Sequence, residues 1–386
     1  MTSLLIRLSH ITFQVSNAQK VIKDLVTKYQ FYPFAARGLD GKSPCQVALR
    51  NGGVVFMVNQ KTFTDSDMLY DSAVTLQSPD TVCNVSFEVE DVPSLSRRLV
   101  DEGCQLLVSP TELHDDFGSV TFCVVKSILG NVRHTLFDCT RYRNNFLPEF
   151  QTIESGDHIP VGNMSYIDHV TYACPRGTSP HVLRWYERCF GFKHFPLSKA
   201  EDPERGFEIR GPQIGLRLMA ADSPALGKMV LAESLPQEGN NQVDLFLQHH
   251  KQGGIQHVGL FTPDIFKAAE SMVQQGARFT NQPPTYYSDP RKQQEIRGLG
   301  LEPEMLSRFG ILLDSSFTGP EIHNNRYLLQ VFAEPLFSKD SFYLELIERQ
   351  DAEGFGEGNI RALWRALKDF LDSTNQKEEK ISSNAV

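Results

Sequence analysis

Apolar positions along the chain follow an order that occurs twice: an alternating run, a run at helical spacing, then a short aromatic run. Residues 8–37 and 167–197 both show it, and each alternating run carries a histidine, in "LSHITFQV" and in "IDHVTYAC". Alternation predicts a strand, and apolar residues three or four positions apart predict a helix. The helical positions are Val21, Ile22, Leu25 and Val26 in the first segment and Val182, Leu183, Trp185 and Tyr186 in the second. The two segments are therefore copies of one unit.

A second pair of segments repeats in the same way. Residues 83–110 and 255–283 each read as a strand, an acidic turn, a helix, a glycine and another strand. Each half of the chain thus holds two modules, and such a repeat defines the architecture before any other feature does. We predict an α+β fold of tandem βαβββ modules that form two open-barrel domains, followed by a C-terminal helix.

The same patterns set the expected boundaries. We expect an N-terminal domain without catalytic function over residues 1–147, a polar linker around 146–163, and a metal-binding C-terminal domain over 160–350. A helix over 351–372 follows, with apolar residues along one face. That helix would either pack on the core or close over a cavity as a gate. Residues 373–386 are expected to form a disordered tail.

Charge and composition exclude several kinds of function. The chain of 386 residues has a formal net charge of −9, which leaves no basic field for binding nucleic acid. It contains no apolar run long enough to span a bilayer, so we expect no transmembrane segment. Its seven cysteines form no CxxC pair. A zinc ribbon or a disulfide framework is therefore not expected, and a reducing compartment fits better.

The N-terminus has two interpretations. Arg7, Lys20 and Lys23 precede the first acidic residue, Asp24, and a basic start that lacks acidic residues is typical of mitochondrial targeting segments. The same stretch also fits an ordinary first strand. We expect a mitochondrial location, and a cytoplasmic location is the alternative.

Three residues of the second half form a candidate metal site. His169 and His257 lie at matching places, each on the first strand of a module, so both would face the cavity of one barrel. Glu345 shares a strand face with apolar neighbours, where a carboxylate needs a partner or a metal ion. Two imidazoles and one carboxylate leave positions open on an Fe(II) that must also bind substrate and dioxygen. The alternative is that each histidine is an ordinary core or surface residue.

The first half provides a comparison for this site. Its matching positions are His10, Asn84 and, depending on the register, Leu136 or Phe137, so one ligand type of three is kept. We therefore expect the first half to keep the fold without a metal ion. Four other histidines are expected in loops or at the surface, namely His181, His194, His249 and His250.

Four motifs carry a family resemblance: "GGIQHVGLFTPDI", "PPTYY", "RYLLQVFAEPLF" and "FYLELIERQDAEGFGEGNIRALW". Together they resemble the 4-hydroxyphenylpyruvate dioxygenase and 4-hydroxymandelate synthase family, including its dioxygenase-like branch in animals, over about residues 7–372. The resemblance implies a vicinal-oxygen-chelate fold and one Fe(II) per chain on His169, His257 and Glu345. It also implies an aromatic 2-oxo acid and dioxygen as substrates and, by analogy, a homodimer.

The resemblance further implies a substrate pocket. Its residues would be Gln242, Gln256, Gln330, Phe332, Phe355, Asn359 and Ile360. Amide groups would orient the keto acid, and aromatic faces would hold its ring.

Three positions depart from the dioxygenase pattern. Ile360 stands where the dioxygenase has a pocket phenylalanine, and 4-hydroxymandelate synthases resemble this chain in having a small aliphatic residue there. Leu218 and Ala232 stand where the dioxygenase has a serine and an asparagine. Because the wall against the ring is reduced, we expect attack on the benzylic carbon of 4-hydroxyphenylpyruvate to give 4-hydroxymandelate. Its carbon skeleton suits a route to 4-hydroxybenzoate and the ubiquinone head group.

Two alternatives stay open. One is a 4-hydroxyphenylpyruvate dioxygenase that makes homogentisate. The other is an iron-binding paralogue without catalysis that has a binding or regulatory role, which the loss of polar pocket residues favours. Retention of all three ligands opposes that second alternative, because a buried carboxylate beside two histidines is costly without a metal ion.

Overall fold

The computed structural model describes most of the chain. The described residues are 5–39, 45–61, 70–71, 78–153, 163–197, 201–211, 214–236, 240–315, 326–352, 354–356, 358–360 and 362. Among them, residues 358–360 and 362 are helical. Residues 351–352 and 354–356 are not helical, so the expected start of this helix at residue 351 is wrong, because the glycine-rich stretch includes Gly356 at φ +76°. The other residues of the expected helix up to 372 and the tail expected over 373–386 lie outside the described residues.

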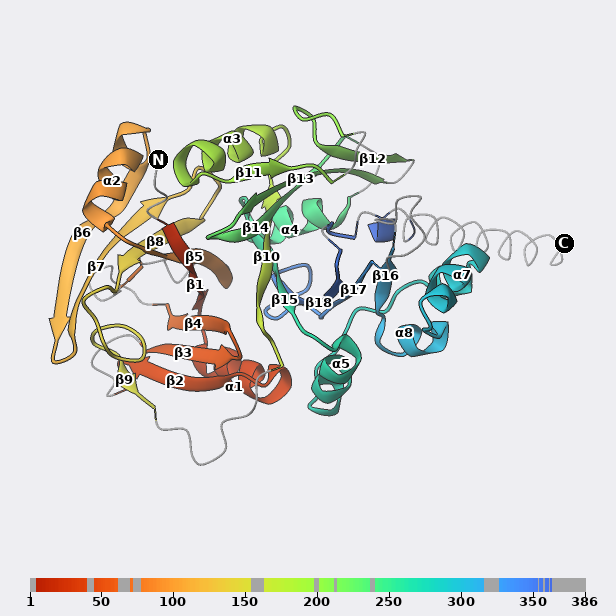
Figure 1. The fold of residues 1–386 in the computed structure, drawn as a ribbon, viewed down its shortest axis with the longest axis horizontal. Coiled ribbons are helices and arrows are strands. Elements are labelled where there is room, and N and C mark those ends of the chain that lie inside the picture. Colours follow the sequence, from red (N-terminus) through yellow and green to blue (C-terminus); the bar gives the residue numbers. More distant parts are fainter. Residues whose placement is uncertain are drawn as a thin grey trace, which may run out of the picture. The chain divides into compact units, whose positions relative to one another are not determined.

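The first half consists of two βαβββ modules and one short strand (Figure 1). The first module comprises β1 (Leu5–Val15), α1 (Ala18–Tyr29), β2 (Tyr32–Arg37), β3 (Gln46–Asn51) and β4 (Val54–Gln60). The second comprises β5 (Thr81–Val89), α2 (Val92–Asp101), β6 (Gln105–Asp115), β7 (Gly118–Lys126) and β8 (Arg133–Asp138), and β9 (Gln151–Thr152) follows.

The second half repeats this order with insertions. Its first module comprises β10 (Tyr166–Cys174), α3 (Ser179–Phe190), β11 (Lys193–Phe195), β12 (Phe207–Gly211), β13 (Ile214–Ser223) and β14 (Gly227–Ser234), and α4 (Gln242–His250) follows. Its second module comprises β15 (Gly254–Phe261), α5 (Ile265–Gln274), α6 (Pro284–Ser288), α7 (Pro290–Gly298), α8 (Pro303–Phe309), β16 (Leu312–Asp314), β17 (Tyr327–Phe332) and β18 (Tyr343–Gln350).

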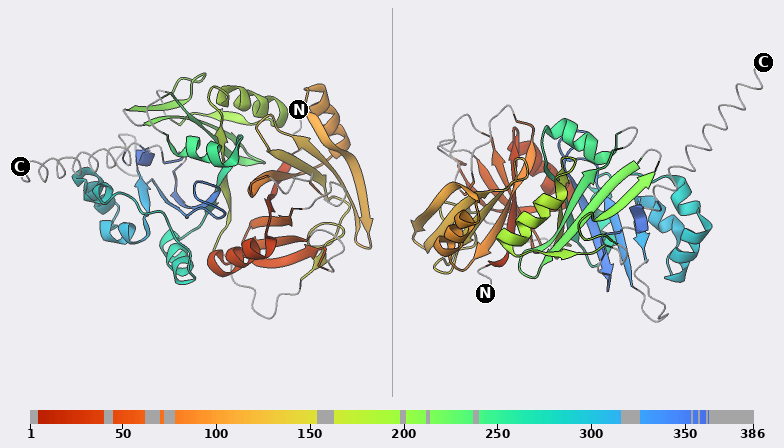
Figure 2. Two further views of the ribbon diagram at one scale, coloured as in Figure 1. Left: turned by 180° about the vertical axis from the view of Figure 1, so that it is seen from behind. Right: turned by 90° about the horizontal axis from the view of Figure 1, so that it is seen from above.

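The strand order is the same in both sheets, which confirms the α+β fold of tandem modules. The first sheet has the order β6-β7-β8-β5-β1-β4-β3-β2-β9, and the second has β11-β13-β14-β10-β15-β18-β17-β16, with β12 paired to β13. In each sheet the first strands of the two modules are neighbours at the centre. Helix α3 packs against β13 and β14, where Figure 2 shows it in yellow-green along one face of their sheet.

The acidic turn of the repeated block has a clear structural cause. Asp91 and Asp264 occupy matching places before α2 and α5, and each side chain accepts a hydrogen bond from the backbone N–H three residues later. Such caps satisfy donors that the first helical turn leaves unpaired. A short polar residue is therefore required at both starts.

The stretch expected as a linker is packed over its first part. Leu147 and Phe150 are buried in a cluster with Phe34, Met57 and Phe137 in the first half. The short strand β9 then pairs with β2. The expectation of a linker from residue 146 is therefore wrong for residues 146–153, because their apolar side chains fill the first half's interior. Residues 154–162 lie outside the described residues.

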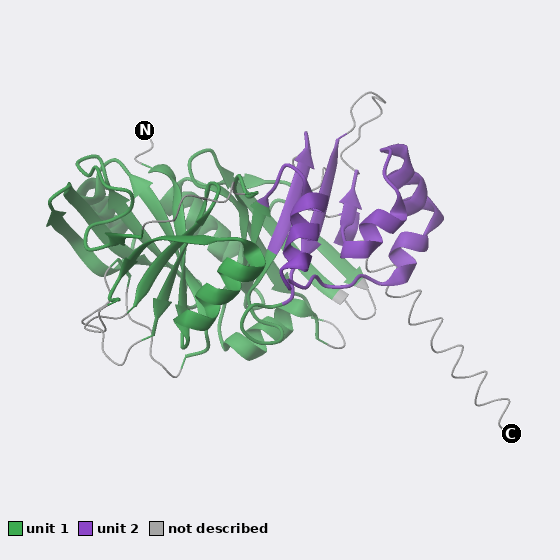
Figure 3. Ribbon diagram, turned by 90° about the horizontal axis from the view of Figure 1, so that it is seen from below, with its two compact units in different colours: residues 1–260, 335–344 green, residues 261–334, 345–386 purple. Residues whose placement is uncertain are grey.

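The chain forms two compact units, coloured separately in Figure 3. The first comprises residues 1–260 and 335–344, and the second comprises residues 261–334 and 345–386. These units follow packing rather than the sequence repeat, so the domain boundary expected between residues 147 and 160 stays a prediction. No helix in the described part of the chain is long and apolar enough to cross a membrane.

Candidate metal centre

Two histidines on neighbouring strands turn their rings toward each other. The Nε2 atoms of His169, on β10, and His257, on β15, are 3.4 Å apart, and the ring planes are nearly perpendicular at 88°. Two imidazole nitrogens bound at right angles to one ion, each at about 2.1 Å, would be about 3 Å apart. The pair therefore has nearly the spacing of two ligands on a single ion.

Neighbouring residues fix the orientation of each ring. His169 Nδ1 lies 2.9 Å from Asp168 Oδ1, and an ionised carboxylate can only accept a hydrogen bond. The proton then sits on Nδ1 and the lone pair of Nε2 is presented to the partner histidine. The Tyr343 ring stacks on His257 with the centroids 4.8 Å apart and the planes at 20°. A Cβ atom at Gly259 would clash with the His169 ring, so glycine is required there.

A chain of buried hydrogen bonds holds Glu345 on β18. Gln330 Nε2 donates to Glu345 Oε1 at 3.1 Å, and Asn359 Nδ2 donates to Gln330 Oε1 at 2.9 Å. The Tyr286 hydroxyl lies 2.8 Å from Asn359 Oδ1 and accepts a hydrogen bond from the backbone N–H of Leu313. All four side chains in this series of hydrogen bonds are buried. Glu345 is therefore oriented by the amide of Gln330.

The glycine-rich stretch packs directly on this hydrogen-bond chain. Gly356 has φ +76°, and a Cβ atom there would clash with the Gln330 side chain. A Cβ atom at Gly358 would clash with Asp314, whose Oδ2 accepts a hydrogen bond from the Gly358 N–H. Both positions therefore favour glycine, because the backbone lies close to the Gln330 and Asp314 side chains. This close packing brings Asn359 to Gln330.

The three ligands predicted from the sequence come together. The donor atoms of His169, His257 and Glu345 all lie within 4.8 Å of one another. His169 and Glu345 are buried, and His257 is half-buried. Among the residues that the structure describes, no other set of three histidine, cysteine or acidic side chains has such spacing. Two imidazoles and a carboxylate suit a divalent transition metal with open coordination positions. Asp168, Gly259 and Tyr286 support this site but were not predicted.

The His169 face of the sheet is mostly apolar beyond the ligand. Residues directly opposite on paired strands share a face, as do alternate residues along one strand. Leu218 on β13 lies opposite Ala232 on β14, and Ala232 lies opposite Ala173 on β10. Ala173 is four residues beyond His169 and therefore on its face. The two apolar departures noted in the sequence thus lie side by side, facing the same way as the predicted ligand.

The remaining predicted substrate residues have different environments. Gln330 and Asn359 are bonded to each other, as described above. Gln256 is buried, and its Nε2 lies 3.5 Å from the backbone oxygen of Gln242. The Gln242 side chain is exposed at the start of α4. The role expected for Gln242 therefore has no support from its side-chain position and stays a prediction.

The predicted aromatic and aliphatic pocket residues lie in the second compact unit. Phe332 is half-buried and lies directly across from Glu345 on the paired strand. Phe355 is buried, with the Arg349 guanidinium 5.5 Å from its ring centre. Ile360 is half-buried, and its N–H donates to the Gly356 carbonyl oxygen. Their roles in substrate binding stay predictions.

In the first half, the position that matches the metal centre is filled by aromatic rings. His10 is fully buried, with ring centroids 5.8 Å from Phe137 and 5.4 Å from Phe146. Burial, with a smaller effect from Arg7, lowers the pKa of His10 to about 3. Asn84 is hydrogen-bonded to Thr135. The expectation that the first half binds no metal ion stays a prediction.

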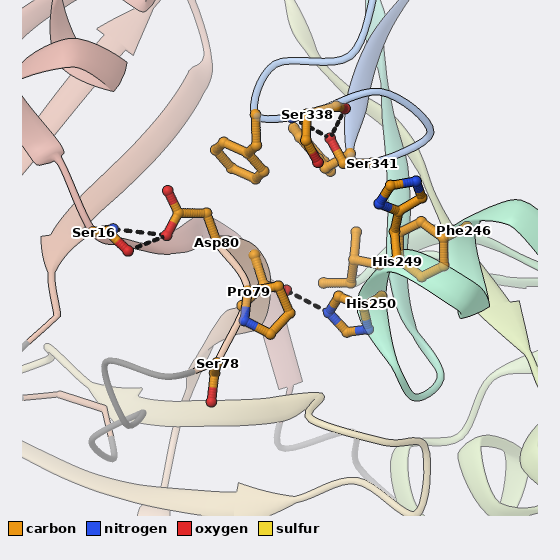
Figure 4. A pocket seen from close by; sticks show the side chains of 13 residues that line it. Ser16, Ser78, Pro79, Asp80, Phe246, His249, His250, Ser338 and Ser341 are labelled. Carbon is orange, nitrogen blue, oxygen red and sulfur yellow. Dashed lines mark hydrogen bonds between the residues drawn. The ribbon is translucent and has the colours of Figure 1, made fainter.

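One histidine prediction is wrong. His250, expected at the surface, is buried at the end of α4, and its Nε2 lies 2.8 Å from Thr81 Oγ1. Its neighbour His249 is exposed, as expected. Both line a cavity of about 340 Å³ that includes none of the predicted ligands. In Figure 4, Ser16 and Asp80 lie on one side of that cavity and His249, His250 and Phe246 on the other.

Comparison with known proteins identifies a matching family model and relatives that span nearly the whole chain. Residues 166–312 match the family model of the Glyoxalase/Bleomycin resistance protein/Dioxygenase superfamily. A 4-hydroxyphenylpyruvate dioxygenase-like protein of Mus musculus is 41% identical over 379 residues, which cover 96% of this chain and 98% of the relative. A 4-hydroxyphenylpyruvate dioxygenase of Caenorhabditis briggsae is 28% identical and covers 94% of this chain and 91% of the relative.

A solved structure has the same fold. It is a variant of 4-hydroxymandelate synthase from Streptomyces coelicolor, with a TM-score of 0.74 and 22% sequence identity, and the match covers 94% of this chain and 98% of that one. The similarity extends over both halves of the chain and confirms the tandem vicinal-oxygen-chelate architecture.

Proposed function

The chain belongs to the family of 4-hydroxyphenylpyruvate dioxygenase-like proteins, and from this premise we propose that it is an Fe(II)-dependent enzyme that converts 4-hydroxyphenylpyruvate and dioxygen into 4-hydroxymandelate. The resemblance expected from the sequence is confirmed by these relatives. The observation that supports the chemistry most directly is the set of His169, His257 and Glu345, with donor atoms within 4.8 Å of one another.

The residues around the site have distinct tasks in this proposal. A bound Fe(II) would supply a chelation site for the 2-oxo acid and a binding site for dioxygen. Asp168 keeps the His169 proton on Nδ1, so that Nε2 is a neutral ligand. Gln330 fixes one carboxylate oxygen of Glu345 through its amide. Burial of His169 and Glu345 lowers the local dielectric and strengthens their interaction with a cation.

The choice of product rests on shape rather than on acid–base chemistry. Ile360 has no ring to hold the substrate's aromatic group, and Leu218 and Ala232 present apolar side chains. A shift of about 1 Å in a bound substrate is enough to change which atom reacts. These features support hydroxylation of the benzylic carbon over hydroxylation of the ring. The product would be a precursor for a reaction that shortens its side chain to an aromatic acid.

Product identification tests the proposal. Purified protein loaded with Fe(II) under ascorbate is given 4-hydroxyphenylpyruvate in air, and 4-hydroxymandelate and homogentisate are quantified by mass spectrometry. We expect 4-hydroxymandelate from the wild type and from His249→Ala, whose histidine is exposed on α4, and none from His257→Ala. Homogentisate instead would favour the dioxygenase alternative. Neither product from iron-loaded protein would favour the non-catalytic paralogue.

The role of Ile360 has a separate test. Ile360→Phe restores a ring at the half-buried position next to Asn359. We expect the ratio of homogentisate to 4-hydroxymandelate to rise in this variant. An unchanged ratio at an unchanged rate would show that Ile360 does not select the product.

A further inference from the structure

The face that carries His169 also carries a buried hydroxyl group. Thr171, on β10, is 3% exposed, and its Oγ1 has no hydrogen-bond partner among the described residues. A buried hydroxyl that has lost its water partners without gaining others is destabilising, so such a group in a folded protein calls for an explanation. A ligand that enters this side of the sheet would supply the missing partner.

The direction of the side chain follows from the strand. Tyr172 contacts Tyr186 of α3, with ring centroids 5.9 Å apart, so it points to the helix-covered face. Thr171 points the opposite way, as His169 does, because side chains alternate along a strand. Two residues along a strand advance by about 6.6 Å. The hydroxyl thus lies one inward-facing position beyond His169 along β10.

On the β14 side of this hydroxyl the neighbouring side chains are apolar. Thr171 lies opposite Val230, which lies opposite Ala220. The next row on the same face is Ala173, Ala232 and Leu218. Within these two rows Thr171 is the polar side chain, so an aromatic ring lying on them would meet apolar surface everywhere except at its Oγ1 atom.

We propose that Thr171 Oγ1 hydrogen-bonds the ring hydroxyl of the 4-hydroxyphenyl keto acid. This inference rests on the proposed function. The keto and carboxylate oxygens bind at the metal end, so the para hydroxyl is the polar group at the far end of the substrate. Thr171 selects for substrates that carry it, because a buried ring hydroxyl without a partner is unfavourable. Thr171 is therefore a specificity-determining residue.

The first half contains a matched control. Thr12 follows His10 at the same interval as Thr171 follows His169, and it is also fully buried without a partner for its Oγ1 among the described residues. Its neighbourhood differs, since Phe137 and Phe146 pack on His10. Thr12→Val therefore reproduces the loss of a buried hydroxyl from the same kind of strand, away from the proposed substrate.

The test compares two ligands that differ by the ring hydroxyl alone. Dissociation constants for 4-hydroxyphenylpyruvate and phenylpyruvate are measured by calorimetry on Fe(II)-loaded protein without oxygen. We expect the wild type, Thr171→Ser and Thr12→Val to prefer 4-hydroxyphenylpyruvate. In Thr171→Val the preference should fall on the order of 10-fold, the effect of losing one hydrogen bond, while the affinity for phenylpyruvate is kept.

The other outcomes distinguish a failure of the role of Thr171 from a failure of the proposed function. An unchanged preference in Thr171→Val, with both keto acids still bound, would overturn the role of Thr171 and leave the proposed function standing. Failure of the wild type to bind either keto acid would overturn both. Loss of phenylpyruvate binding in Thr171→Val would indicate that this variant does not fold. Thr171→Ala is therefore measured in parallel as a second variant without the hydroxyl. A preference kept in the alanine variant would equally overturn the role of Thr171.

Discussion

Residues that bind nothing themselves decide whether the two imidazoles face each other. Gly259 is the clearest case, because any side chain there occupies the space of the His169 ring. Asp168 acts from the other side by holding Nδ1. Removing such supporting contacts typically weakens metal binding by roughly 10- to 100-fold.

Gly259→Ala is therefore expected to lower the affinity for Fe(II), or for Mn(II) as a stable substitute, by about 10- to 100-fold. The physical reason is displacement of the His169 ring by the added methyl group. Gly298→Ala is the control, because a Cβ atom there meets no atom within 4 Å. Metal titrations of the three proteins check the expectation, and equal affinities would contradict it.

The buried His10 makes stability depend on pH. Its pKa is about 3 when folded against 6.5 when unfolded, so between these values only the unfolded chain binds the proton. Stability is unaffected above about pH 6.5 and falls as the pH drops, by about 1.4 kcal/mol per pH unit for this residue. In His10→Leu the slope of unfolding free energy against pH should shrink by about that amount between pH 6 and 4.

Denaturant unfolding at several pH values measures this slope. His249→Leu serves as the control because His249 is exposed. A His10→Leu slope equal to that of the wild type would mean that folding does not lower the pKa of His10.

The sequence predicted the metal ligands but not the residues that hold those ligands in place. Two histidines at equivalent repeat positions predicted their meeting, since the repeat relates their strands. Asp168 and Gly259 carry no such signal, because their roles depend on contacts between strands. His250 was mispredicted because Thr81, 169 positions away in the chain, supplies its partner.

At the scale of elements, the second half's last module differs from the others by the helices inserted between α5 and β16. Helix α6 supplies Tyr286, which ends the hydrogen-bond chain through Asn359 and Gln330 to Glu345. An insertion has no counterpart in the repeat. Matching the two halves of the chain therefore predicted the ligands but could not predict Tyr286.

Tyr286→Phe should weaken metal binding by disconnecting this chain, on the order of 10-fold. It should also lower the free energy of unfolding by about 1–3 kcal/mol, because the Leu313 N–H and Asn359 Oδ1 lose a partner. Tyr287→Phe is a matched control: it removes a buried hydroxyl that bonds Ile311 but not Asn359. Equal metal affinities in the two variants, measured by titration, would argue against the relay.

The helices and strands themselves were largely predictable, because each βαβββ module obeys simple periodicity. The expected helices at Val21–Val26 and Val182–Tyr186 lie within α1 and α3. The linker was predicted too early, since composition alone does not reveal that Leu147 and Phe150 fill the first half's interior.

At the scale of the whole molecule, metal binding should be linked to stability. An ion that binds the folded state at 100 times its dissociation constant stabilises it by about 2.7 kcal/mol, which corresponds to a rise of a few degrees in Tm. We expect Fe(II) or Mn(II) to raise the Tm of the wild type, and a chelator to reverse the change. His257→Ala should show neither effect in the same thermal scans, and a rise as large in that variant would place the ion elsewhere.

The packing of Gly356 and Gly358 against Gln330 and Asp314 has a consequence for shortened chains. A premature stop codon just before residue 354 would leave every strand of both sheets encoded. It would nonetheless delete Asn359 and both glycines, so that Gln330 would lose the amide that orients it toward Glu345. Alleles that remove only about the last tenth of the protein are thus expected to impair the metal site, as substitution of a ligand would.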